Sequence, residues 1–160
     1  MNIYGIVYKL FISPQYLEDG IVASMKFFVT GVGGQLGHDI MNELHKRGHA
    51  GIGSDIAPSY SGVQDGSAVC TMPYVAMDIT DATQVETVIT EVAPDVVIHC
   101  AAWTAVDKAE DEKEICRKVN KDGPANIANV CEKIDIPMMY FSTDYVFDGQ
   151  GVEPWQPDCK

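Results

Sequence analysis

Short apolar runs alternate with amphipathic segments along most of this chain. The apolar runs predict strands at about residues 27–30, 50–54, 73–77, 96–100 and 136–141. Between these runs, apolar positions recur at helical spacing in 35–47 and 81–92, and a more polar helical region is expected over 110–133. The run at 96–100 is continuous, as in parallel strands buried on both faces. Strands alternating with helices predict an α/β fold, a right-handed, doubly wound parallel sheet.

Local signals mark where these elements end. Asp81-Ala82-Thr83-Gln84 resembles a capping box at the start of the second helix, and Pro94-Asp95 ends that helix. Gly123-Pro124 is expected to break or bend the polar helical region, or to begin a new first turn. The stretch 55–67 is rich in Gly, Ser and Pro and is predicted to be a loop.

A glycine-rich turn follows the first strand. Residues 31–37 place Gly31, Gly34 and Gly37 at G-x-x-G-x-x-G spacing, with Gln35 and Leu36 between the last two. Gly31 would allow a tight turn, Gly34 would let the backbone approach phosphates, and Gly37 would let helix and strand pack closely. The helix that follows would direct free N–H groups at an anion. Because a complete βαβ unit surrounds these glycines, the sequence favours a Rossmann NAD(P)-binding domain.

Asp55 ends the second predicted strand. An acidic side chain there can accept hydrogen bonds from the adenosine ribose hydroxyls of a dinucleotide. The alternative is a loop aspartate that opens a turn before Pro58. A carboxylate at this position repels a 2′-phosphate, and no Arg or Lys follows closely. NADH is therefore the first expectation, and NADPH is left open.

The remaining candidate residues also follow predicted strands, whose carboxyl ends share the ligand-binding edge of such a sheet. Asp78 would face the adenine or cap the next helix. The small residues of Ala101-Ala102-Trp103-Thr104 would run beside the nicotinamide ribose or form a plain exit loop. The Thr143 hydroxyl could hydrogen-bond a substrate oxygen that gains charge, or cap a turn, and Asp144 and Tyr145 could likewise be turn residues.

The histidines and cysteines suggest no further chemistry. The four histidines show no metal-ligand spacing, so no metal site is expected, and His99 is expected to be a core histidine with its hydrogen bonds satisfied rather than a base. The five cysteines include no C-x-x-C pair and are odd in number, which favours reduced thiols in a cytoplasmic protein.

Composition narrows the class of protein. With 160 residues and 17.5 kDa, the chain is expected to be one domain, and a net charge of −12 argues against nucleic-acid binding. The apolar run near the N-terminus is interrupted by Lys9 and is too short for a membrane span, and no basic segment precedes it. Met25 stands directly before the first predicted strand, as a natural start would. Residues 1–24 are therefore predicted to be an extension, or a misassigned start, outside the fold; the alternative is that they pack on its surface. Residues 25–160 are predicted to be the Rossmann domain.

Several segments closely resemble dTDP-4-dehydrorhamnose reductases, members of the extended short-chain dehydrogenase/reductase superfamily. They are Thr30–Gly37, Met77–Thr80, His99–Glu110, Val119-Asn120 and Ser142–Gly149. The family reduces the 4-keto group of dTDP-4-dehydro-L-rhamnose with NADH or NADPH. The resemblance implies that Thr143 is the catalytic hydroxyl, and that Asp144 and Tyr145 meet the sugar nucleotide. It also implies a set of residues lining the cofactor: Gly34, Gln35, Leu36, Asp55, Asp78, Ile79, Ala101, Ala102 and Trp103.

One departure from the superfamily is evident. Its Tyr-x-x-x-Lys pair supplies the proton, and no tyrosine here has a lysine four positions on: Tyr140 is followed by Asp144 and Tyr145 by Gly149 at that spacing. In the family the pair and the C-terminal substrate region follow the segment that corresponds to Ser142–Gly149. The chain is therefore expected to be the amino-terminal, cofactor-binding part of a reductase, and to show little or no turnover by itself. The full-length protein is expected to form a homodimer.

Two alternatives belong to other functional classes. One is a non-catalytic dinucleotide-binding regulatory module, which a natural chain without the Tyr-x-x-x-Lys pair would favour. The other is a sister sugar-nucleotide epimerase or dehydratase, which would retain NAD through purification. The Trp103–Asp107 segment favours the reductase.

Overall fold

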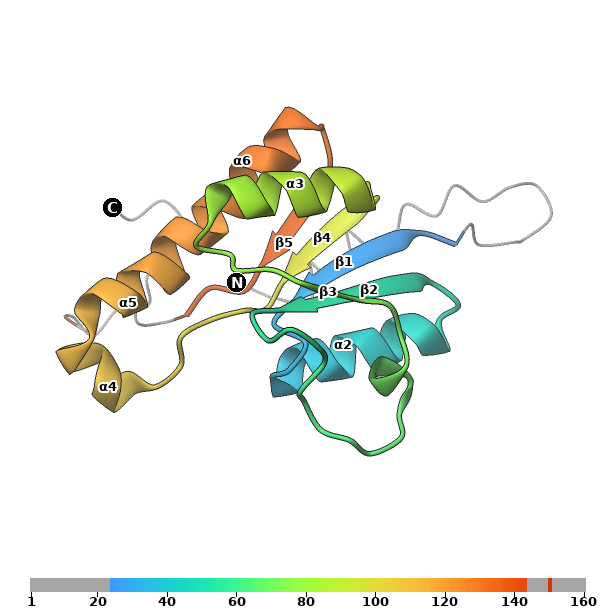
Figure 1. Cartoon of the computed structure of the whole chain (residues 1–160), viewed down its shortest axis with the longest axis horizontal. Coiled ribbons are helices and arrows are strands. Elements are labelled where there is room, and N and C mark those ends of the chain that lie inside the picture. Colours follow the sequence, from blue (N-terminus) through green and yellow to red (C-terminus); the bar gives the residue numbers. More distant parts are fainter. Residues whose placement is uncertain (1–23, 144–149, 151–160) are drawn as a thin grey trace. The chain divides into compact units, whose positions relative to one another are not determined.

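A single parallel sheet organises the compact part of this chain. The computed structural model describes residues 24–143 and Gln150 (Figure 1). Five parallel strands lie in the order β3-β2-β1-β4-β5. Their bounds are β1 Lys26–Thr30, β2 Ala50–Asp55, β3 Tyr74–Ala76, β4 Val96–His99 and β5 Met138–Tyr140. From β1 the chain moves outward to β2 and β3, then crosses back to β4 and β5, so the predicted doubly wound Rossmann fold is confirmed.

The chain divides into two compact units. Ser24–Phe141 form one unit, which contains every strand and helix described here. Ser142, Thr143 and Gln150 belong to the other unit. Among the described residues, no helix is both long and apolar enough to cross a bilayer.

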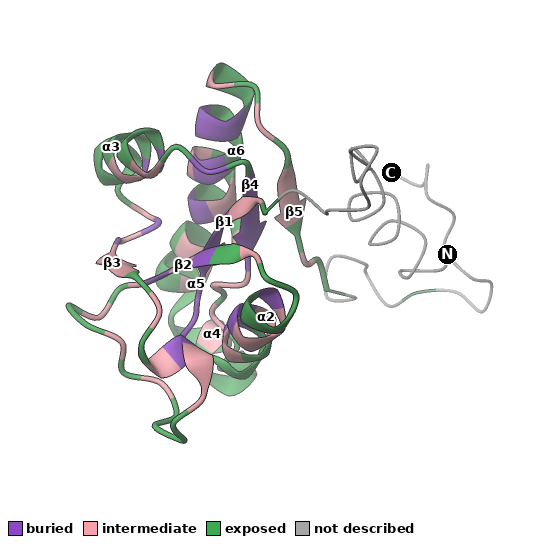
Figure 2. Ribbon diagram, turned by 90° about the vertical axis from the view of Figure 1, so that its right-hand side faces the viewer, coloured by how far each residue is buried: buried purple, intermediate pink, exposed green. Residues whose placement is uncertain are grey.

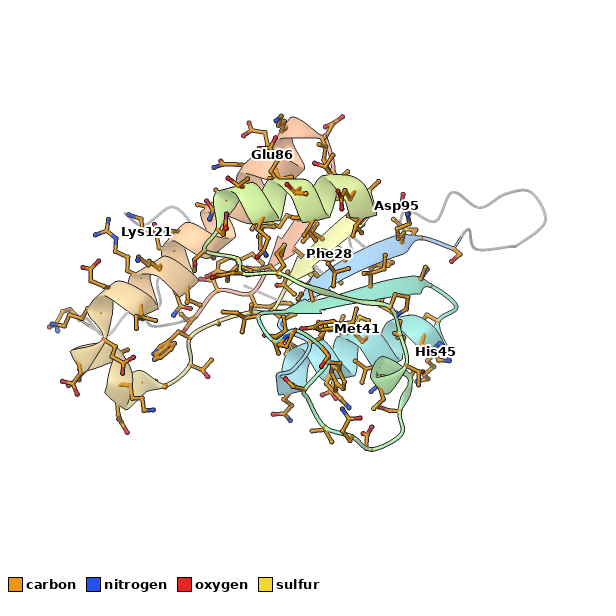
Figure 3. The ribbon with its side chains drawn as sticks, in the orientation of Figure 1. Phe28, Met41, His45, Glu86, Asp95 and Lys121 are labelled. Atoms are coloured by element: carbon orange, nitrogen blue, oxygen red, sulfur yellow. The ribbon has the colours of Figure 1, made fainter. Side chains whose placement is uncertain are left out.

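Helices cover both faces of the sheet. Helix α2 (Gln35–Lys46) packs on one face, and α3 (Ala82–Val92) and α6 (Gly123–Lys133) pack together on the other (Figure 1). Phe28 on β1 is fully buried in the core beneath α3 and α6, and Met41 lies between α2 and the strands (Figure 3). Buried residues therefore follow the central strands and the inner sides of the helices (Figure 2).

Glycines on β2 make room for α2. A Cβ atom at Gly51 would lie 3.2 Å from Met41 Sδ, and one at Gly53 would lie 3.4 Å from Met41 Cε and 3.1 Å from Val32 Cγ2. Larger side chains would push the helix away from the sheet. The glycine-rich sequence of β2 thus reflects close helix packing rather than a flexible strand.

The edge strands are shorter than predicted at both ends, and a proline precedes each of them. Pro73 and Pro137 have no N–H to donate, although their carbonyls accept hydrogen bonds from Gly53 N (2.8 Å) and Val97 N (3.1 Å). Ladder pairing therefore starts only after each proline.

The segment between β4 and β5 is helical from Val106 onward, earlier than the predicted start at Glu110. Helices α4 (Val106–Asp111) and α5 (Lys113–Arg117) lead into a π-helical turn at Lys118–Asp122, and α6 follows directly. Of the three outcomes foreseen for Gly123-Pro124, the structure has the new first turn: Pro124 stands in the first turn of α6, where no intrahelical N–H is needed.

Helix α3 begins with only half of the predicted capping box. Asp81 Oδ1 accepts hydrogen bonds from Thr83 N and Gln84 N, both at 3.0 Å. The Gln84 side chain accepts a hydrogen bond from Asp78 N rather than from Asp81 N. The helix ends at Ala93, which adopts a left-handed conformation (φ 45°) before Pro94.

Candidate functional site

A cavity of about 770 Å³ lies at the carboxyl ends of the strands. All the residues predicted to contact a dinucleotide line it. They are Gly31, Gly34, Gln35, Leu36, Gly37, Asp55, Asp78, Ile79, Ala101, Ala102, Trp103 and Thr104. The structure therefore brings together residues from four separate connections that the sequence singled out independently.

The three glycines of the turn have different steric environments. Gly31 has φ +72°, and a Cβ there would lie 2.5 Å from Ala101 N, so this position requires glycine. A Cβ at Gly37 would lie 2.4 Å from Gly31 O, so helix and turn touch there. Gly34 has an ordinary extended backbone (φ −87°, ψ 167°), and a Cβ there would contact only Gly31 O, at 3.4 Å. The fold would accept a side chain at Gly34, and that side chain would stand at the cavity wall.

The N-terminus of α2 is exposed to the cavity. Gly34 is its N-cap residue and supplies no side chain to the first turn, which also contains no acidic residue. The first N–H groups of a helix have no intrahelical acceptor, and the helix dipole makes this end positive. Gln35, Leu36 and Gly37 line the cavity at this point. The arrangement suits an anion such as a pyrophosphate.

Asp55 is held by backbone groups at the end of β2. Its Oδ2 accepts a hydrogen bond from Gly33 N (2.9 Å), and its Oδ1 accepts one from Ile56 N (2.8 Å). Each oxygen keeps a further lone pair for a ligand hydroxyl. No lysine or arginine is among the described residues that line the cavity.

Asp78 does not cap α3, since Asp81 does. Instead, Asp78 Oδ1 accepts hydrogen bonds from Thr80 N and Thr80 Oγ1, both at 2.8 Å, and so closes a turn beside the cavity. Of the two alternatives drawn from the sequence, the helix cap is excluded. The adenine contact stays a prediction.

Two asparagines hold the walls of the cavity, and sequence reasoning gave neither a role. Asn120, in the π-helical turn, accepts a hydrogen bond from Trp103 N (2.8 Å) and donates one to Trp103 O (3.0 Å). Asn126 on α6 donates to Ile79 O (3.0 Å). These bonds fix the backbone of two loops that line the cavity. A polar residue in a helix that follows such loops is the signal that could have suggested this.

A row of side chains at the strand ends forms the floor of the cavity. The row consists of Ser54 on β2, Thr30 on β1, His99 on β4 and Tyr140 on β5. Each residue is the register partner of the next one across the sheet, and all four line the cavity. Thr30 Oγ1 lies 2.6 Å from His99 Nδ1. The rings of His99 and Tyr140 stack with centroids 5.6 Å apart and planes inclined by 20°. His99 is buried as expected, but only its Nδ1 has a partner.

Three buried side-chain atoms among the described residues have no hydrogen-bond partner: Ser54 Oγ, His99 Nε2 and Trp103 Nε1. Buried polar atoms are nearly always paired in folded proteins. Each of these three belongs to a residue that lines the cavity. A polar ligand bound in the cavity, such as a dinucleotide, is therefore a candidate partner for these atoms.

The residues predicted to act on the substrate do not belong to the unit that contains the cavity. Thr143 is exposed and belongs to the second unit, whereas Asp144 and Tyr145 lie outside the described residues. Their catalytic and substrate roles stay predictions. In the described part of the chain, no group of three His, Cys, Asp or Glu side chains could hold a metal ion. Burial raises the pKa of the Cys100 thiol to about 12, so this cavity residue is not a nucleophile at neutral pH.

Three features together define the Rossmann class of nucleotide-binding folds. They are a parallel sheet wound in two directions, an uncapped helix N-terminus after a glycine turn, and a cavity at the carboxyl edge of the sheet. Within that class, residues 25–160 match the model of a family described as the RmlD substrate binding domain. The chain belongs to this family.

Several known proteins similar to this chain are named dTDP-4-dehydrorhamnose reductases. A dTDP-4-dehydrorhamnose reductase from Streptomyces griseus is 35% identical over 133 residues, which are 83% of this chain and 38% of that protein. The crystal structure of a dTDP-4-dehydrorhamnose reductase orthologue from Clostridium acetobutylicum has a TM-score of 0.68 and 35% identity, covering 85% of this chain and 42% of its own. The enzyme from Bacillus anthracis, in complex with NADP, has a TM-score of 0.64 and 30% identity, covering 82% of this chain and 40% of its own. The chain thus spans about two fifths of the length of these relatives.

Proposed function

We propose that this chain forms the cofactor-binding part of an NAD(P)H-dependent reductase that converts dTDP-4-dehydro-L-rhamnose to dTDP-L-rhamnose. Family membership supports the reaction, since the Streptomyces griseus relative is a dTDP-4-dehydrorhamnose reductase. The Bacillus anthracis relative, crystallised with NADP, supports the cofactor class. A cytoplasmic location and a homodimer of the whole protein belong to the same proposal.

The proposed roles of the residues follow from the geometry of the cavity. The N–H groups at the start of α2 would bind the pyrophosphate, Asp55 would accept hydrogen bonds from the adenosine ribose, and Asp78 with Ile79 would lie along the adenine. The loop 101–104 would run along the nicotinamide ribose. When bound, the reduced nicotinamide supplies the hydride.

Two chemical roles complete the proposal. The Thr143 hydroxyl would donate a hydrogen bond to the substrate carbonyl oxygen, which gains negative charge as hydride is added. Asp144 and Tyr145 would contact the sugar nucleotide. No tyrosine in this chain has a lysine four positions on, so no residue here is assigned as the proton donor.

The observation that carries the cofactor assignment is the set of unpaired buried polar atoms, all on residues that line a cavity beside an uncapped helix N-terminus. Gly34 gives the sharpest test. Its extended backbone suits residues other than glycine, and a Cβ there would lie 3.4 Å from Gly31 O. Gly34→Val should therefore leave the fold intact and place its side chain where the phosphates would bind. We expect the full 160-residue chain to bind NADH. We expect Gly34→Val to weaken that binding roughly 10-fold or more, because the loss of hydrogen bonds between the backbone and the phosphates should cost over about 1 kcal/mol.

Gly48→Ala is the matched control. Gly48 lies beyond the opposite end of α2 with φ +76°, and a Cβ there contacts nothing within 4 Å. Its substitution should cost about 1 kcal/mol of stability through the left-handed backbone and leave NADH affinity unchanged. Calorimetric titration and thermal melts of both variants separate the two effects. Failure of the unaltered chain to bind NADH, NADPH or ADP would sink the proposal.

A further inference from the structure

His99 is the most deeply buried of the cavity residues with an unpaired nitrogen. It is 1% exposed at the end of β4, between Thr30 on β1 and Tyr140 on β5. Its Nδ1 bonds with Thr30, and its Nε2 has no partner. We infer that His99 is a ligand-binding residue, whose Nε2–H donates a hydrogen bond to an oxygen on the nicotinamide-nucleoside half of the bound dinucleotide.

The position of the ring proton follows from the neighbouring hydrogen bonds. Thr30 Oγ1 accepts the N–H of Ala101 at 3.4 Å and lies 2.6 Å from His99 Nδ1. Among the described residues, His99 Nδ1 is the one acceptor within reach of the Thr30 hydroxyl hydrogen. If Nδ1 accepts that hydrogen, the single proton of a neutral ring lies on Nε2. Burial lowers the pKa of His99 to about 4, so the ring is neutral at pH 7. We therefore assign Nε2 as a donor without an acceptor among the residues that the structure describes.

The place of His99 in the sheet indicates which half of the ligand it would meet. If the start of α2 holds the pyrophosphate and Asp55 the adenosine ribose, then β2 and β3 lie under the adenosine half. The other half must cross the ends of β4 and β5, where His99 and Tyr140 stand. Trp103 Nε1, a second unpaired donor, follows β4 as well. This inference rests on the proposed function, because it takes the cavity to bind a dinucleotide.

The oxygen that accepts this bond could be a ribose hydroxyl or the carboxamide of the nicotinamide. Both are neutral acceptors, so the bond should be worth about 1 kcal/mol, or roughly 3- to 10-fold in affinity. Three ligands distinguish the ribose hydroxyl from the carboxamide. ADP lacks the whole nicotinamide half, ADP-ribose adds the second ribose, and NADH adds the nicotinamide.

Three substitutions separate ligand contact from structural support. In His99→Asn the amide oxygen occupies the place of Nδ1 and keeps the bond to Thr30, but no group reaches the place of Nε2. His99→Phe keeps a ring that can stack on Tyr140 but lacks both nitrogens. In His99→Gln the longer side chain brings an amide N–H to the place of Nε2, so it serves as the conservative rescue.

The experiment is a titration of the full chain and these variants with ADP, ADP-ribose and NADH, with a thermal melt of each variant. We expect His99→Asn and His99→Phe to bind ADP like the unaltered chain and to bind NADH 3- to 10-fold more weakly, with His99→Gln restoring most of that loss. An equal loss for ADP-ribose would assign the ribose hydroxyl, and a loss for NADH only would assign the carboxamide.

Two results would overturn the inference while leaving the proposed function in place. One is unchanged NADH affinity in His99→Asn and His99→Phe. The other is an equal loss for all three ligands without rescue by His99→Gln, which would show that His99 only supports the fold. If the unaltered chain bound none of the ligands, the proposed function would fail first, and the inference with it.

Discussion

Asp55 combines two tasks in one carboxylate. It accepts the N–H groups of Gly33 and Ile56, which fixes the end of β2 against the glycine turn, and it still presents lone pairs to the cavity. Its negative charge has no nearby lysine or arginine among the described residues of the cavity wall. A ligand with a phosphate on the adenosine ribose would therefore meet uncompensated repulsion. If Asp55 faces the adenosine ribose as proposed, we expect NADH to bind more tightly than NADPH.

Asp55→Asn tests this directly. The asparagine keeps an oxygen acceptor for one of the two backbone N–H groups, of Gly33 or Ile56, and removes the charge. Because both dinucleotides meet the same loss of the other bond, the ratio of their affinities isolates the charge. We expect the ratio of NADPH to NADH affinity to rise about 10-fold, the effect of one charge interaction worth about 1.4 kcal/mol near the surface. Titration of both dinucleotides into both proteins gives the ratio. An unchanged ratio would mean that Asp55 does not face the ribose 2′ position.

At the scale of elements, the start of α3 shows which part of the predicted capping box the structure forms. Asp81 was predicted to cap this helix and does so through two backbone N–H groups. The second bond of a capping box, from the Asp81 N–H to the Gln84 side chain, is not formed. The Gln84 side chain instead accepts the N–H of Asp78, which lies in the turn beside the cavity. The helix start and the cavity wall thus share one turn.

We expect Asp81→Ala to lower the free energy of unfolding by about 1 kcal/mol, the usual cost of losing an N-cap. Asp81→Ser should retain most of that stability, since its hydroxyl oxygen can accept the same bonds. Chemical denaturation of the three proteins measures the difference. If the alanine and serine variants were equally destabilised, charge rather than capping would be the stabilising feature.

At the scale of the whole molecule, the sequence predicted a doubly wound parallel sheet, a glycine-rich turn after β1 and an acidic residue at the end of β2. Each of these could be predicted because it depends on the pattern or chemistry of residues close together in the sequence. Gly31 could be foreseen since its left-handed backbone favours glycine. The row of Ser54, Thr30, His99 and Tyr140 could not, because it depends on the register between strands far apart in sequence. The π-helical turn that presents Asn120 likewise has no local signature in the sequence.

The buried histidine should also make the stability of the molecule depend on pH. An unfolded chain binds a proton to His99 near pH 6.5, whereas burial lowers the folded-state pKa to about 4. Between these values the unfolded state binds more protons, so stability falls as the pH is lowered, by up to about 3 kcal/mol in all. Denaturation at pH 7, 5.5 and 4.5 should show this loss, and His99→Phe should show a smaller one. Parallel pH profiles for the two proteins would contradict this assignment.

Gly123 links the outer helix layer to the cavity. A Cβ there would lie 2.7 Å from Ile79 Cδ1, the flexible end of a side chain that lines the cavity, so the clash would be relieved by moving Ile79 rather than the helix. A side chain at position 123 would therefore act on the cavity wall through Ile79. If the cavity binds a nucleotide as proposed, a search for altered specificity should include position 123 alongside the residues of the cavity wall.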